Sequence, residues 1–62
     1  MKSREIMKRL EAEGWRLLRV NGSHHMMGHP TNPDVIVVKH PQKDCPLGTL
    51  KKIERQSGVK LR

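Results

Sequence analysis

The first apolar positions of the chain recur with the spacing of a helix. Ile6 and Leu10 lie four residues apart and Met7 lies beside them, so one helical stripe carries all three. Ser3 precedes this stripe and is the expected N-cap, because its hydroxyl can accept a hydrogen bond from a free backbone N–H. The pattern therefore predicts a helix over residues 3–13.

Glycines mark where this helix and the following segment end. Gly14 suits the position after a helix, and Trp15 behind it can make the hydrophobic contact of a Schellman ending. Residues 15–20 mix apolar and cationic side chains and end at Asn21-Gly22, which is a strong hairpin signal. We expect a strand over residues 15–20 with a tight turn behind it.

Two further segments have the pattern of strands. Residues 23–29 follow the turn as the returning strand, and residues 30–33, with two prolines, form the next turn. Residues 34–39 are rich in β-branched side chains and form a third strand. The simplest topology for these segments is an antiparallel meander.

A second helix is predicted after a loop at 40–46 that has a proline near each end. Pro46 fits the first helical position, and Gly58 fits the residue after the helix, which then runs to about Ser57. The apolar stripe of this helix is supplied by Leu47, Leu50 and Ile53.

The order of elements predicts an α+β fold. Two helices on one face of a three-stranded antiparallel sheet form a two-layer sandwich, with the α-β-β-β-α order of a double-stranded-RNA-binding domain. The chain has 62 residues, so we expect residues 1–62 to form a single domain. Cys45 is the only cysteine, so no disulfide within the chain can stabilise this small fold.

The charge of the chain narrows the choice of partner. Thirteen Lys and Arg residues face six Asp and Glu residues, which favours a polyanion, with nucleic acid first and an acidic protein second. Trp15 is the only aromatic residue of the Phe, Trp and Tyr types, so a sheet that stacks bases on aromatic rings is disfavoured. No signal peptide or membrane span is visible in the sequence, and we expect a cytoplasmic protein.

The segment Gly22-Ser23-His24-His25 carries the candidate chemistry. Histidine is the side chain that most readily exchanges protons near neutral pH, and alternation along a strand places these two histidines on opposite faces. From the residues alone, His24 is either a proton-transfer group open to a polymer or a polar residue beside a turn. Ser23 is likewise either a phosphate ligand or a solvated residue.

Four pieces of sequence, taken in order, carry a resemblance to a known family. They are SREIMKRLEAEGW at the start, GSHH at 22–25, HP-x-K-D-x-P at 40–46 and GTLKKI-x-x-x-SG at 48–58. Over nearly its whole length the chain resembles HicA-type mRNA interferase toxins. These toxins belong to type II toxin–antitoxin systems and have a fold similar to a double-stranded-RNA-binding domain.

The resemblance implies a ribosome-independent endoribonuclease that cleaves mRNA and so inhibits translation. It implies His24 as the catalytic residue and a HicB-type antitoxin as the protein partner that covers the active site. The family usually has an aromatic residue where this chain has Met27, which suggests that His25 faces the helices and His24 the open side of the sheet. A second departure is Glu54, at a position that is often aliphatic in the family.

Several other residues are expected to support His24 or to bind substrate: Gly22, Ser23, His25, Lys39, His40, Lys43 and Lys51. The histidine and cysteine spacings match no structural zinc pattern, so we expect a metal-independent enzyme with no cofactor. Two alternatives on the same fold stay open, namely a non-catalytic RNA-binding module and a basic protein-interaction domain. One imidazole supplies one proton transfer, and the second group is not identified by the sequence.

Overall fold

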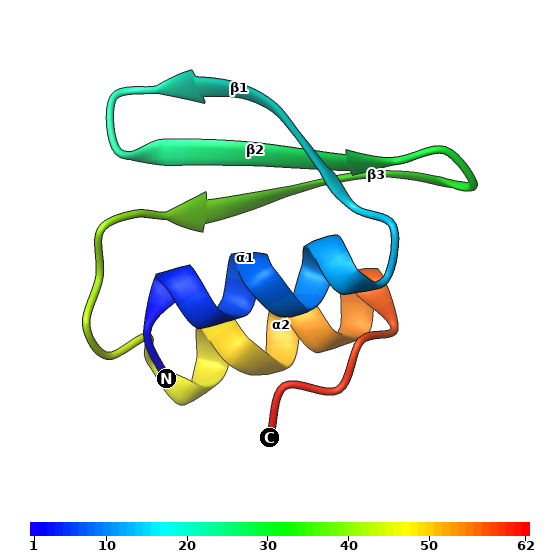
Figure 1. Cartoon of the computed structure of the whole chain (residues 1–62). Coiled ribbons are helices and arrows are strands. Elements are labelled where there is room, and N and C mark those ends of the chain that lie inside the picture. The colour runs from blue at the N-terminus through cyan, green and yellow to red at the C-terminus, as the bar shows by residue number, and fades with distance from the viewer.

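The computed structural model describes residues 1–62 and has the predicted order of elements. These are α1 (Ser3–Ala12), β1 (Arg16–Asn21), β2 (His24–His29), β3 (Asn32–Lys39) and α2 (Leu47–Ser57). The strands form one antiparallel sheet in the order β1-β2-β3, and both helices lie side by side on one face of it (Figure 1). The predicted two-layer α+β sandwich is confirmed. Neither helix is long and apolar enough to cross a membrane.

The end of α1 has the predicted geometry. Gly14 has a φ of 98°, in the left-handed region that glycine tolerates best. Its N–H donates to the Glu11 carbonyl at 3.1 Å, and the Trp15 N–H donates to the Leu10 carbonyl at 3.0 Å. This pair of bonds defines a Schellman ending, and it turns Trp15 back into the core.

The start of α1 differs from the prediction, because Ser3 is not the N-cap. Lys2 occupies that position without a side-chain cap, and Ser3 is the first helical residue, with only 1% of its surface exposed. The Ser3 Oγ accepts a hydrogen bond from the Gln42 backbone N–H at 2.9 Å and lies 2.8 Å from His40 Nδ1. The hydroxyl therefore ties α1 to the loop after β3.

The first hairpin turns one residue later than predicted. Asn21 pairs with His24, so the loop consists of Gly22 and Ser23. Gly22 has a φ of 62° at the first loop position, where a type II′ turn requires a residue that accepts positive φ. The third strand also begins earlier than predicted, at Asn32.

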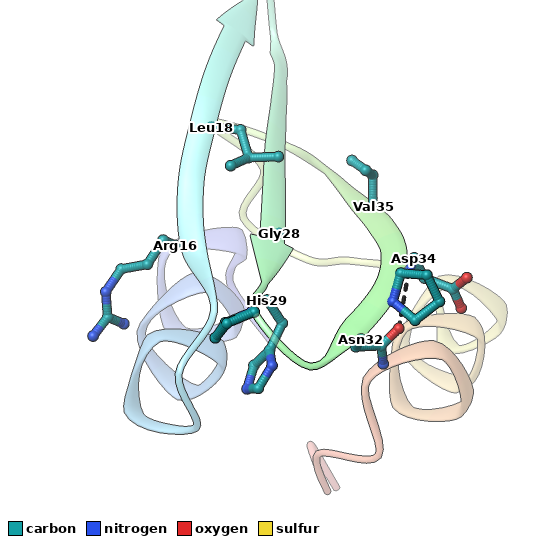
Figure 2. Close-up of a pocket in the computed structure, with 9 residues that line it drawn as sticks. Arg16, Leu18, Gly28, His29, Asn32, Asp34 and Val35 are labelled. Atoms are coloured by element: carbon teal, nitrogen blue, oxygen red, sulfur yellow. Dashed lines mark hydrogen bonds between the residues drawn. The ribbon is translucent and has the colours of Figure 1, made fainter.

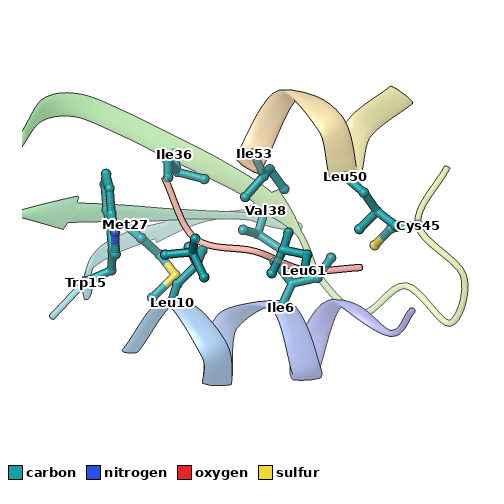
Figure 3. Close-up of a cluster of buried hydrophobic side chains, with 11 residues drawn as sticks. Ile6, Leu10, Trp15, Met27, Ile36, Val38, Cys45, Leu50, Ile53 and Leu61 are labelled. Carbon is teal, nitrogen blue, oxygen red and sulfur yellow. The ribbon is translucent and has the colours of Figure 1, made fainter. Parts of the chain in front are cut away.

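The core lies between the sheet and the two helices (Figure 3). Met27 of β2 and Ile36 and Val38 of β3 are the buried sheet residues, while all six residues of β1 are exposed. The sheet face that carries His25 and Met27, which was predicted to face the helices, is thus the buried one. The whole cluster consists of Ile6, Leu10, Trp15, Met27, Ile36, Val38, Cys45, Leu50, Ile53, Val59 and Leu61.

The second helix begins one residue later than predicted. Pro46 is the N-cap rather than the first helical residue, and Gly58 ends the helix with a φ of 74°. Leu50 and Ile53 are buried as expected. Leu47 does not join them, because its position in the first turn leaves 54% of it exposed.

Glu54 holds the C-terminal tail against α2. Its carboxylate accepts hydrogen bonds from the Leu61 N–H at 2.8 Å and from the Arg62 N–H and Nε at 3.2 and 3.0 Å. The bond from Leu61, together with the Arg62 contacts, lowers the pKa of Glu54 from its ordinary value of 4.5. Leu61 is 4% exposed, so this carboxylate seats an apolar residue in the core.

Candidate functional site

His24 is the first residue of β2 and is exposed on the sheet face away from the helices. It pairs with Asn21 on β1 and with Lys39 on β3. Side chains directly opposite one another across strands have Cβ atoms about 4.5–5.5 Å apart on the same face. The imidazole therefore stands between an amide and an ammonium group, open to solvent.

His25 faces the opposite way, as strand alternation predicted. It pairs with Val38, which is 1% exposed, and its ring lies 4.9 Å from the ring of His40 in an edge-to-face arrangement. The His25 Nδ1 atom is buried and has no hydrogen-bond partner. The structure thus brings His25 and His40 together beneath the sheet and separates both from His24.

The loop after β3 is fixed to the hairpin that carries His24. The His40 backbone N–H donates to the Ser23 carbonyl at 2.8 Å. The His40 side chain contacts the Ser3 hydroxyl through Nδ1, which leaves Nε2 as its free nitrogen. The Ser23 side chain is exposed beside His24, at the tip of the hairpin.

The predicted supporting lysines are not gathered around His24. Lys39 is its direct neighbour across the sheet. Lys43 lies in the loop before α2 and Lys51 lies on α2, so neither belongs to the sheet face of His24. Asn21 is the neighbour that the sequence did not indicate, because the predicted turn included it. Placing the turn one residue later would have revealed this pairing.

His29, at the far end of β2, has a structural role. The Thr31 N–H donates to its Nδ1 at 3.1 Å, so Nε2 carries the hydrogen that is donated to the Glu13 carbonyl at 2.9 Å. This links the β2–β3 turn to the end of α1. No three His, Cys, Asp or Glu side chains come together as a set that could hold a metal ion.

A pocket of about 380 Å³ lies at this far end of the sheet (Figure 2). Leu18 and Val35 are on its outer side, with Gly28 between them, and His29 turns toward the helices. A Cβ atom on Gly28 would lie 2.8 Å from Leu18 Cδ1, so only a glycine at this position leaves room for the Leu18 side chain to pack against the β2 backbone. The pocket does not include His24 and lies at the opposite end of β2.

A second hollow of about 350 Å³ lies between α1 and the hairpin. His25 and His40 both line this hollow. The start of β2 therefore presents two surfaces, with His24 on the open sheet face and His25 on the groove side.

The chain is a small basic protein, and its α-β-β-β-α sandwich has the element order of a double-stranded-RNA-binding domain. It carries an exposed histidine at its first hairpin. Residues 3–59 match the family described as "HicA toxin of bacterial toxin-antitoxin". The chain belongs to this HicA toxin family. It is also similar to a solved structure titled "HicA3 and HicB3 toxin-antitoxin complex", with 33% identity, 100% coverage of both chains and a TM-score of 0.89. A comparison with curated proteins gave no match.

Proposed function

We propose that this HicA-family chain is a cytoplasmic endoribonuclease toxin that cleaves mRNA without ribosomes or a metal ion. His24 is its proton-transfer residue. The observation that carries the proposal is the exposed His24 imidazole at the hairpin, with Lys39 directly opposite it in the sheet. A formal charge of +7 favours binding of the phosphate backbone and makes that binding sensitive to salt.

The chemistry assigns separate roles to the groups on this face. The RNA 2′-hydroxyl attacks the adjacent phosphorus, the 2′-hydroxyl loses its proton and the leaving 5′-oxygen gains one. His24 performs one of these transfers, which typically contributes about 10²–10⁴-fold to the rate. The Lys39 ammonium stabilises the negative charge that develops on the phosphate oxygens. His25 and His40 face away, so water is proposed for the second transfer.

We further propose that a HicB-type antitoxin binds the chain and covers His24. Support comes from the similar solved structure, whose title names HicA3 together with HicB3. The net positive charge would also attract an acidic partner and speed its association.

The test is cleavage of an end-labelled mRNA by purified protein in the presence of EDTA and without ribosomes. His24→Gln keeps a polar side chain but removes the titratable ring, so we expect the rate to fall at least about 100-fold. Lys60→Gln is the control, because it removes one exposed cation in the C-terminal tail. Circular dichroism should show that both variants are folded.

Full cleavage by a folded His24→Gln protein would reject the catalytic assignment. Salt-sensitive RNA binding with intact RNA after long incubation of the wild type would instead favour a non-catalytic RNA-binding module. Partner binding with no RNA affinity at low salt would favour a protein-interaction domain.

A further inference from the structure

The groove between α1 and the β1–β2 hairpin is an open, partly apolar site on the opposite face from His24. Its volume is about 350 Å³, which is within the range of small-molecule sites. Leu17 is 49% exposed at its edge, whereas Met27 is 1% exposed beneath it. The lining residues are Arg4, Met7, Lys8, Glu11, Leu17, His25, Met27 and His40.

The α1 side of the groove has a charge gradient along its length. Arg4, Lys8 and Glu11 follow the i, i+4, i+7 spacing of one helix face. Arg4 and Lys8 place two positive charges toward the N-terminal end, and the Glu11 carboxylate lies about 10 Å beyond Arg4 along the axis. Because Ser3 holds His40, this histidine lies at the cationic end. The groove therefore favours a ligand with an anionic group at the end of Arg4 and Lys8 and a hydrogen-bond donor at the end of Glu11.

The two histidines supply uncommitted polar groups in the groove. His40 has a free Nε2, because its Nδ1 is held by Ser3. His25 has a buried Nδ1 without a partner, and a buried polar atom left without a hydrogen bond is destabilising. A ligand whose binding lets the His25 ring rotate can give Nδ1 a hydrogen-bond partner and so remove this destabilisation.

The apolar part of the groove can accept a flat ring, although no Phe, Trp or Tyr side chain lines it. Met7, Leu17 and Met27 supply it. Methionine side chains adapt their shape to the group packed against them and make favourable contacts with aromatic rings. A heterocyclic base would cover the exposed part of Leu17 and leave its polar edge near the histidines.

We propose that this groove binds one unpaired nucleotide of the RNA substrate. Its phosphate contacts Arg4 and Lys8, and its base packs against Leu17 and Met7. This inference rests on the proposed function and names a substrate subsite for it. His25 follows His24 directly in β2, so an RNA strand that passes around the Gly22-Ser23 turn meets the catalytic face and the groove in succession. The groove accepts a single base, and cleavage should therefore favour unpaired RNA.

Two neighbouring leucines provide a matched test of whether bound RNA occupies the groove. Leu17 is 49% exposed on the groove side, and Leu18 is 60% exposed on the open face, beside Gly28. Leu17→Glu and Leu18→Glu introduce the same charge at adjacent positions of one strand. Binding of a 2′-O-methyl RNA hexamer, which has no attacking hydroxyl, is measured by fluorescence anisotropy. We expect Leu17→Glu to weaken binding at least about 10-fold and Leu18→Glu less than about 3-fold.

Methyl NMR of the wild-type protein gives a second readout that no misfolded variant can confuse. Met7 lines the groove, whereas Met26 lies on the open face, where its sulfur accepts a hydrogen bond from Arg19. Titration with the same hexamer should shift the Met7 methyl signal more than that of Met26. A larger shift at Met26, with Met7 unchanged, would overturn the proposal.

The outcomes separate this inference from the proposed function. If His24→Gln abolishes cleavage but Leu17→Glu binds RNA as tightly as Leu18→Glu, the subsite is wrong and the catalytic proposal stands. If Leu17→Glu selectively loses RNA binding while the wild type cleaves nothing, the subsite is supported and the nuclease is rejected. If Leu17→Glu loses only a protein partner, the groove is a protein-docking site and the subsite is wrong.

Discussion

Ser3→Ala tests whether a buried hydroxyl, rather than a helix cap, fixes the start of α1. The substitution removes the acceptor of the Gln42 N–H and the partner of His40 Nδ1. A partly buried donor left without an acceptor costs about 1–3 kcal/mol. Alanine is the better helix former and offsets about 0.5 kcal/mol of this at most. The expected loss in the free energy of unfolding is about 2 kcal/mol.

That loss is large for so small a protein. Stability of about 0.05–0.15 kcal/mol per residue corresponds to roughly 3–9 kcal/mol for the whole chain. A change of about 2 kcal/mol should lower the Tm by roughly 8–16 °C, since domains of this size shift by about 4–8 °C per kcal/mol.

Urea denaturation followed by circular dichroism measures the effect, with Thr49→Ala as the control. Thr49 is exposed in the first turn of α2, and its loss should change stability by less than about 0.5 kcal/mol. A Ser3→Ala protein within that same margin would refute the reasoning. A double-mutant cycle with His40→Ala should give a coupling energy of at least about 0.5 kcal/mol if the two side chains act together.

Three further predictions concern the fold. The Leu61 N–H lowers the pKa of Glu54 from 4.5, so its stabilisation is present at neutral pH and is lost as the pH falls through the lower, folded-state pKa. Glu54→Gln should therefore lower the Tm at about pH 7 and reduce its fall below about pH 4.5, as thermal melts can show. Burial raises the pKa of the Cys45 thiol, so reaction with a disulfide reagent should be at least about 100-fold slower in native than in urea-unfolded protein. Equal rates would show that the thiol is open. Gly14→Ala places a Cβ 2.7 Å from His29 Nε2 at a φ of 98° and should cost about 1–3 kcal/mol in urea denaturation.

The features that the sequence predicted well depend on short-range geometry. Gly14 and Trp15 mark the end of α1 because the Schellman bonds join residues only a few positions apart. The opposite faces of His24 and His25 follow from strand alternation, and position 27 correctly identified the buried face.

The features that the sequence missed depend on partners far away in the chain. Ser3 has a good N-cap side chain, but its hydroxyl bonds a backbone group 39 residues away. Glu54 stands out in the sequence only as a departure at a position that is often aliphatic in the family, whereas in the structure it holds a tail that folds back seven residues later. The groove also depends on tertiary packing, because α1 and the hairpin line it together. No local periodicity contains that information.

The absence of buried residues in β1 has a consequence for how the sheet opens. Detaching this strand breaks its backbone bonds to β2 but leaves intact the buried cluster, which contains no β1 residue. Local opening free energies are low where few buried contacts are lost. The amides of β1 should therefore exchange with solvent deuterium well before those of β3, which carries Ile36 and Val38. A partner could then change the conformation of β1, the strand that precedes His24 in the first hairpin, while the rest of the chain stays folded.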